Sequence, residues 1–191
     1  MWETYPITAR SLRHEPGEQK ECMAMNAATI REAEPPNALQ LFHVNFNCSN
    51  LDRSRAFYES IGFKVVNDFS QGEPQTFAEI GLAPMLRLPA DCRAKALLLS
   101  VSDQARTTRI DLIEWISPAS EAPARGNLAR IGFGRLCLKV KDCAALHARL
   151  VRDERVVYSE PLLIEMGGTR QLCFCCEDPD GIVIEFMQFL K

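Results

Sequence analysis

The sequence predicts an α+β protein built from two βαβββ modules, whose curved sheets pair around a central cavity with the helices on the outside. Two observations lead to this fold class. Residues 39–63 have the pattern of a strand, a turn and a helix, and further strands follow. Residues 133–150 repeat that pattern, and an offset of 92 aligns the two units without a gap over roughly two dozen residues, pairing His43 with Arg135 and Asn50 with Asp142.

The first strand, residues 41–48, alternates between a polar and an apolar face. His43, Asn45 and Asn47 share the polar face, while phenylalanine and valine side chains occupy the other. An alternating strand belongs to a sheet that packs a helix on one side and lines a cavity on the other. Asn50 is a suitable N-cap for the helix that follows, and Gly62 ends it.

The remaining elements follow from the same patterns. In the first module we expect strands at residues 63–68, 76–80, 95–101 and 108–116, with an irregular stretch at 86–94. In the second module we expect a strand at 133–140, a helix capped by Asp142, and strands at 156–158, 162–165, 171–176 and 182–189. Asp178-Pro179-Asp180-Gly181 predicts a tight turn before the last strand.

Domain boundaries follow from changes in composition. Residues 1–38 are polar, contain four prolines and show no sustained period, which predicts an extension that is flexible or draped on the domain. Residues 39–190 form the domain, in which module 39–117 and module 131–190 are joined by a proline- and glycine-containing linker at 118–130.

The composition argues against several classes of partner. Net charge is −3, and neither sign of charge forms a long block, so we expect no nucleic-acid partner. No apolar run approaches the ~18 residues of a membrane span and the N-terminus has no leader pattern, so we expect no membrane partner and a cytoplasmic protein. The eight cysteines are then expected to be thiols, and Cys173, Cys175 and Cys176 lack the paired spacing of a zinc site.

Four segments, taken together in order, resemble the vicinal oxygen chelate superfamily, which includes the glyoxalase I, bleomycin-resistance, methylmalonyl-CoA epimerase and extradiol dioxygenase families. The segments are FHVNFNCSNLDRSRAFYESIGF, IDLIEW, GFGRLCLKVKD and EDPDGIVIEF, and the resemblance covers residues 39–190. In the metal-dependent members, the first and last strands of each module each supply one ligand to a divalent metal at the cavity centre. By motif, these positions are His43, Asp111, Arg135 and Glu185.

The resemblance implies a metal site that has changed in this chain. Asp111 stands where glutamate is commoner, and Arg135 stands where histidine is expected. A guanidinium stays protonated and has no lone pair to give to a metal. One alternative is a divalent Fe, Zn, Mn or Ni held by His43, Asp111 and Glu185, and the other is a site without a cofactor. Arg135 would then either form an ion pair with Glu185 or Asp111, or bind an anionic or carbonyl oxygen.

The resemblance favours a small-molecule enzyme with lyase, isomerase or dioxygenase-like chemistry on an oxygen-rich or carbonyl substrate. His43 is the candidate general base, with Glu185 and Arg135 as the other catalytic candidates. Candidate substrate-binding residues are Arg135, Asn45, Asn47, Trp115 and Met187. Plain core packing is the competing interpretation of Trp115, Met187 and Phe189, and Glu114 is expected to be a surface or interface acid.

The alternative function is a metal-free protein that binds or sequesters a small molecule, as bleomycin-resistance members do. We expect a homodimer, although the sequence leaves open whether the modules pair within one chain or between two.

Overall fold

The computed structural model describes residues 38–71, 75–76, 81–121, 128 and 132–191. Residues 40–191 form one compact unit, and the fold described below is that of this unit. The extension predicted at residues 1–38 lies outside the described residues except for its last position, and so does most of the linker predicted at 118–130.

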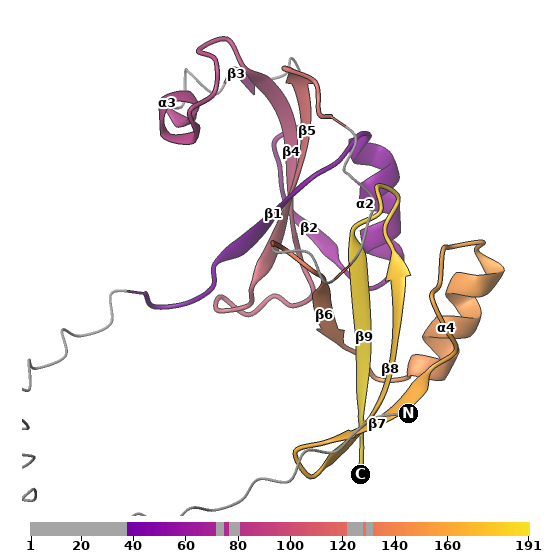
Figure 1. Ribbon diagram of the computed structural model, residues 1–191. Helices are drawn as coiled ribbons and strands as arrows, with labels where there is room; N and C mark the ends of the chain where they lie inside the picture. Colours follow the sequence, from indigo (N-terminus) through magenta and orange to yellow (C-terminus); the bar gives the residue numbers. More distant parts are fainter. Residues whose placement is uncertain (1–37, 72–74, 77–80, 122–127, 129–131) are drawn as a thin grey trace, which may run out of the picture. The chain divides into compact units, whose positions relative to one another are not determined.

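The first module contains a sheet with strand order β1-β5-β4-β2, and a short strand β3 pairs with β4 (Figure 1). Its elements are β1 (His43–Asn47), α2 (Leu51–Ser60), β2 (Lys64–Asp68), β3 (Gln75–Thr76), α3 (Leu82–Leu86), β4 (Arg93–Ser100) and β5 (Arg109–Ser117). The first strand runs parallel to β5, and the other neighbours are antiparallel.

The second module repeats this topology with the strand order β6-β9-β8-β7. Its elements are β6 (Leu136–Lys139), α4 (Cys143–Arg152), β7 (Leu162–Met166), β8 (Thr169–Glu177) and β9 (Val183–Leu190). Its first strand β6 again runs parallel to the last strand β9. The predicted α+β fold of two βαβββ modules is therefore confirmed.

Both helices begin at the predicted caps. The Asn50 side chain accepts a hydrogen bond from the Arg53 N–H at 2.8 Å, and Asp142 accepts one from the Ala145 N–H at 2.9 Å. Each cap satisfies one of the N–H groups that the first turn of a helix leaves without a partner.

One helix was missed and one predicted strand was wrong. The stretch predicted as irregular, 86–94, is irregular between α3 and β4. The sequence did not predict α3 before it, because this five-residue helix contains Pro84 and follows Gly81 at φ 78°, so its sequence carries turn signals rather than a helical period. The predicted strand at 156–158 is a single bridge between Val157 and Cys176, because the chain bends before Pro161 and leaves the sheet.

One continuous core joins the two modules. It contains Phe57 and Tyr58 of α2, Leu112 of β5 and, from the second module, Phe174 and Phe186, all at most 3% exposed. Each sheet therefore turns the apolar face of its strands toward this core, and His43 and Asn45 lie on the opposite face of β1. Among the described residues, no helix is long and apolar enough to cross a membrane.

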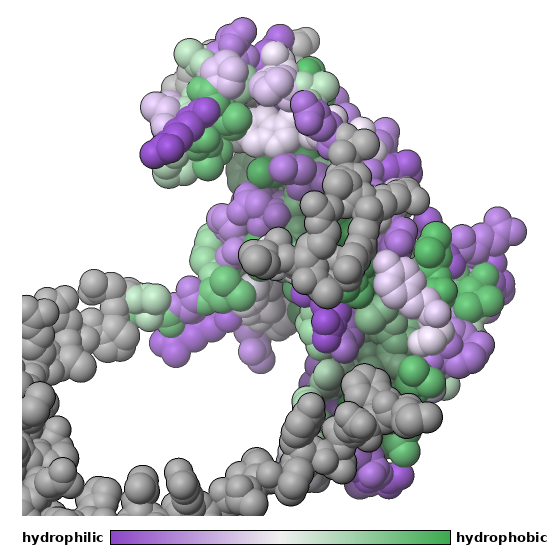
Figure 2. Space-filling model, in the orientation of Figure 1, coloured by the Kyte–Doolittle hydropathy of each residue, from purple (hydrophilic) through white to green (hydrophobic). Residues whose placement is uncertain are grey.

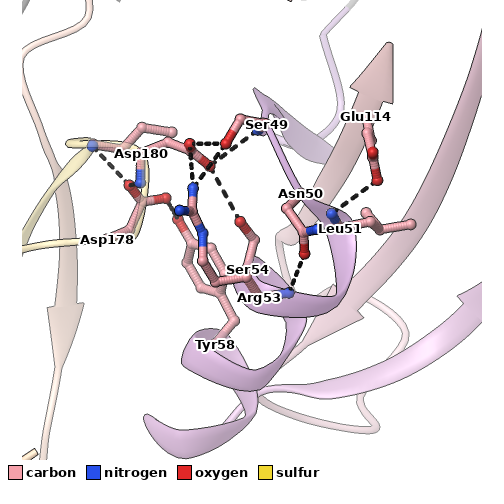
Figure 3. A network of polar contacts seen from close by, with 10 residues as sticks. Ser49, Asn50, Leu51, Arg53, Ser54, Tyr58, Glu114, Asp178 and Asp180 are labelled. Carbon is pink, nitrogen blue, oxygen red and sulfur yellow. Dashed lines mark hydrogen bonds and ion pairs between the residues drawn. The ribbon is translucent and has the colours of Figure 1, made fainter. Parts of the chain in front are cut away.

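The turn between β8 and β9 joins the second module to α2 (Figure 3). Asp180 accepts hydrogen bonds from the Ser49 N–H at 3.1 Å and the Ser49 hydroxyl at 2.6 Å. It also accepts one from Arg53 Nη2 at 2.7 Å and one from the Ser54 hydroxyl at 3.3 Å. A carboxylate at a helix N-terminus is stabilised by the helix dipole and the free N–H groups. We call this contact the module latch.

A second carboxylate of the same turn lies deeper in the latch. Asp178 accepts a hydrogen bond from the Tyr58 hydroxyl at 3.0 Å, and it also accepts the N–H groups of Asp180 and Ile182. Burial raises the pKa of Asp178, although its three donors partly oppose that shift. The predicted tight turn is therefore also the contact between modules.

Candidate functional site

One half of the candidate site lies on β1 and β5, whose parallel register sets Asn45 beside Asp111. The Asn45 amide donates to Asp111 Oδ2 at 2.8 Å. Burial raises the pKa of Asp111, and the neighbouring His43 and the Asn45 hydrogen bond partly oppose that shift. This half therefore places an imidazole next to a carboxylate that is held in one orientation.

One ring nitrogen of His43 is buried without a partner in the described part of the chain. Its Nδ1 is buried and has no hydrogen-bond partner among the described residues. An unpaired buried polar atom is costly, so an atom of this kind often marks a place where a ligand or a proton completes the arrangement. In neutral imidazole, a nitrogen without a proton can accept one from a substrate.

The end of this face is closed by side chains of the same module. Trp115 donates its indole N–H to Asn47 at 2.9 Å. Residues of the segment around α3 pack with Ile113 and Trp115 into a small second core, which also contains Leu82, Ala83, Leu88, Cys92, Ala94 and Ala96. Asn47 and Trp115 thus contact each other. A ligand bound at this end of the face would contact the apolar side chains of this second core.

The other half lies on β6 and β9. Arg135 Nε donates to Glu185 Oε2 at 2.7 Å, and this hydrogen bond, together with the Glu185 charge, raises the pKa of the guanidinium. The Glu185 side chain is 16% exposed and that of Arg135 is 48% exposed. The ion pair that we considered for Arg135 is therefore present, and its partner is Glu185.

A cysteine completes this second half. Cys137 lies beside Glu185 in the β6–β9 register. Burial raises the pKa of the Cys137 thiol to about 11, with a further contribution from the Glu185 charge. The thiol is therefore protonated at neutral pH, and it is a weak nucleophile and a weak metal ligand.

The four positions form two pairs rather than one cluster of ligands. His43 lies near Asp111, and Arg135 bonds to Glu185. Within the described part of the chain, no group of three or more His, Cys, Asp or Glu residues could hold a metal ion. The donors of a single chain therefore do not fit the metal that the resemblance implies, because the third ligand, Glu185, is already bound to a guanidinium.

Two other site predictions meet different outcomes. Phe189 is 47% exposed and Met187 is partly buried, so neither belongs to the main core, and the core-packing interpretation was wrong for Phe189. Glu114, expected at the surface, accepts the Leu51 N–H at 2.9 Å and caps α2. Its position three residues after Asp111, on the other face of β5, was the only sequence signal for that role.

Comparisons with known proteins agree with this architecture. The model of the glyoxalase/bleomycin resistance protein/dioxygenase superfamily matches residues 40–186. No curated protein matches the chain.

Solved structures show the same fold at low sequence identity. A glyoxalase family protein from Bacillus cereus is 18% identical with a TM-score of 0.68, and the match covers 83% of this chain and 99% of that one. The trypanothione-dependent glyoxalase I of Leishmania major is 18% identical with a TM-score of 0.54, over 79% of this chain and 87% of that one. TnmS3, an antibiotic-binding protein from Streptomyces sp. CB03234, is 21% identical with a TM-score of 0.51, over 82% and 100%.

The family match spans both modules and includes all four motifs in full. The order of strands in each sheet repeats between the modules, as the resemblance implies. This chain belongs to the glyoxalase/bleomycin resistance protein/dioxygenase superfamily, also called the vicinal oxygen chelate superfamily.

Proposed function

We propose that the protein is an enzyme that moves a proton within a small molecule carrying a carbonyl or carboxylate oxygen, as a lyase or an isomerase. The observation that carries this proposal is the bond between Arg135 and Glu185, which uses only the Nε atom of a half-exposed guanidinium. The two Nη groups can then donate to a substrate oxygen, and the fixed carboxylate holds the guanidinium in place.

The step is general-base catalysis without a metal. The free nitrogen of His43 removes a proton from the carbon next to a carbonyl group, and the electron pair of that C–H bond moves onto the carbonyl oxygen. Arg135 stabilises the resulting enolate oxygen, and Asp111 stabilises the imidazolium. Where the α-carbon carries a hydroxyl, the hydroxyl proton passes to the enolate oxygen and the imidazolium returns its proton to the former carbonyl carbon, which isomerises the substrate. Where a β-substituent leaves with the electron pair instead, the reaction is a lyase reaction.

The two pairs would meet in a homodimer. Our proposal is that His43 and Asp111 of one copy face Arg135 and Glu185 of a second copy, with Asn45, Asn47, Trp115 and Met187 lining the space between them. The support is that the contacts of each pair stay within its own module. We also propose that the protein works in the cytoplasm, where the seven described cysteines, all free, would remain reduced.

Proton exchange tests the chemistry. Dihydroxyacetone in D₂O serves as a probe, because abstraction of its α-protons by a base is seen as loss of the proton NMR signal. We expect exchange above the buffer rate, a loss of at least tenfold in His43→Ala, and little change in the control Arg152→Gln, whose side chain is 72% exposed on α4. Exchange that is equal in the wild type and His43→Ala would refute the role of His43.

Mixed dimers test the two-chain site. His43→Ala and Arg135→Ala chains are each inactive on their own in this proposal. After unfolding and refolding together, half of the dimers contain one intact site, so about a quarter of the wild-type activity returns. No recovery, or active monomers in light scattering, would contradict a site shared between copies.

A metal held by His43, Asp111 and Glu185 of a second copy is the competing form of the site. Elemental analysis of protein purified without chelator, together with melting curves in Fe, Zn, Mn or Ni, distinguishes the two forms. In a metal-free site, none of these ions is stoichiometric and none raises the melting temperature. Arg135→His should then create metal affinity, because it removes the guanidinium charge and adds an imidazole donor.

The second candidate function is binding without turnover. TnmS3 is an antibiotic-binding protein of the same fold, and the second module of this chain exposes several large apolar side chains. Retention of a bound planar aromatic compound in His43→Ala, with no proton exchange in the wild type, would favour sequestration over catalysis.

A further inference from the structure

We propose that the β7 side of the second sheet binds the apolar body of an amphipathic carboxylate, whose head group binds Lys139. This inference rests on the proposed small-molecule function and names the class of ligand. It concerns a part of the sheet beyond the Arg135–Glu185 pair, uses none of the proposed proton-transfer residues and shares only Met187 with the lining proposed for that site.

The surface is defined by strand register. Lys139 of β6 is opposite Met187 of β9, which is opposite Cys173 of β8, which is opposite Leu162 of β7. Paired residues point to the same face, so these four side chains form one row across all four strands. Three interstrand steps make this row about 14 Å long.

A second row, two residues further along β9, lies beside the first. Phe189 is opposite Gln171, which is opposite Ile164. Leu162, Ile164 and Phe189 are 55%, 41% and 47% exposed. Figure 2 shows apolar side chains reaching the surface in the part of the molecule that β6–β9 and α4 form. Cys173 and Gln171, which lie between these side chains on β8, are only 9% and 3% exposed. The open part of the face is therefore made by the apolar side chains of β7 and by Phe189, with one charged residue at the far end.

In the first module, the corresponding face of the sheet is covered by another segment of the chain. There, the segment between β2 and β4 contains α3, and it packs over Ile113 and Trp115 of the sheet. In the second module, the segment between β7 and β8 is only Gly167 and Gly168. The corresponding apolar surface therefore has no cover of its own among the described residues, and large exposed apolar patches mark binding sites.

The charge at the end of the row selects the head group. The Lys139 ammonium lies 5.2 Å from the centre of the Phe189 ring and forms no ion pair with a described residue. The other cation of this face, Arg135, is paired with Glu185 and is assigned above to the reacting oxygen of the substrate. A carboxylate is therefore the group that complements Lys139, and an alkyl or aryl body of up to about 14 Å would run from it toward β7.

Titration calorimetry with butyrate, hexanoate and octanoate tests this inference on the full-length protein. Affinity should rise about twofold with each added methylene, which corresponds to half of the full transfer effect because one side of the chain remains exposed. Lys139→Gln should abolish the preference for octanoate over 1-octanol. Equal affinity for the three acids, or no binding of octanoate, would overturn the proposal.

Two substitutions on adjacent residues of β7 provide a matched pair. Ile164→Ser alters the proposed surface and should weaken octanoate binding at least threefold. Leu163→Ser changes a side chain that is 47% exposed on the opposite face of the same strand, and it should leave binding unchanged. Melting curves of both variants check folding, and equal effects of the two on binding would refute a surface specific to one face.

Two further measurements separate this inference from its alternatives. Octanoate binding that survives in His43→Ala supports a distinct subsite even if the proton-exchange proposal fails. If Ile164→Ser changes the mass of the particle in light scattering and octanoate does not bind the wild type, the surface is instead an interface between copies and the ligand proposal is wrong.

Discussion

The module latch allows a quantitative prediction, because Asp180 joins two segments that are 127 residues apart in the sequence at its contact with Arg53. Asp180→Ala removes every hydrogen bond that this carboxylate accepts from the beginning of α2. The Arg53 side chain is 50% exposed, so that ion pair contributes at most about 1 kcal/mol. The carboxylate also stabilises the helix N-terminus by about 0.3–1 kcal/mol.

The remaining effect comes from Ser54, which is fully buried. Its hydroxyl loses a partner, which costs about 1 kcal/mol. We therefore expect Asp180→Ala to lower the free energy of unfolding by about 2–3 kcal/mol, a loss typical of a broken buried polar network. Urea denaturation at one fixed protein concentration measures it, since dimerisation would make stability depend on concentration.

The control comes from the matching turn of the first module. Asp103 lies between β4 and β5, is exposed, and has no hydrogen bond among the described residues. Asp103→Ala should leave the free energy of unfolding unchanged. If Asp180→Ala costs less than about 0.5 kcal/mol, or no more than the control, then the latch does not stabilise the pairing of the modules and our reasoning is wrong.

Three further predictions concern single groups. The pKa of Asp178 is raised in the folded protein, so as pH rises above the ordinary value of 3.8 this carboxyl ionises first in the unfolded chain. The wild type should therefore lose stability relative to Asp178→Asn as pH rises through the folded-state pKa. Equal pH profiles of the two proteins in thermal unfolding would contradict this. Glu114→Ala leaves the Leu51 N–H without its cap and should cost about 1 kcal/mol in urea denaturation, whereas Glu121→Ala, at an exposed position, should cost nothing measurable. Asn45→Ala removes a hydrogen bond that lowers the pKa of Asp111, so carbon-13 NMR titration of this carboxyl should show a higher pKa than in the wild type; a lower value would refute that assignment.

Local patterns were sufficient for most of the fold. The period-two alternation around His43 and Arg135 placed both first strands, although the second begins at Leu136 rather than at residue 133. Asn50 and Asp142 marked the starts of α2 and α4, because the side chain of an N-cap accepts a hydrogen bond from a backbone N–H only three residues further along the sequence. The short helix α3 was missed because helices of this length are stabilised by the surface that they cover rather than by their own period.

The site was only partly predictable. The alternation of side chains along β5 and β9 correctly placed Asp111 and Glu185 on the faces opposite the core. It did not decide whether Asp111 or Glu185 would form an ion pair with Arg135. The structure joined Arg135 to Glu185, because the parallel pairing of β6 with β9 brings these two strands together. The partner of Glu114 is the first residue of α2, and the partners of Asp180 belong to the other module, so no sequence period could identify them.

The sequence by itself determined the two modules, their helices and which face of each strand is polar. These features depend on neighbours within a few residues, and periods of 2 and 3.6 encode them directly. The tertiary structure alone decided that His43 retains a free nitrogen, that Glu185 neutralises Arg135 and that Asp178 and Asp180 bind α2. Those outcomes depend on contacts between residues 50 to 131 positions apart, which are set by the pairing of strands within each module and by the packing of one module against the other.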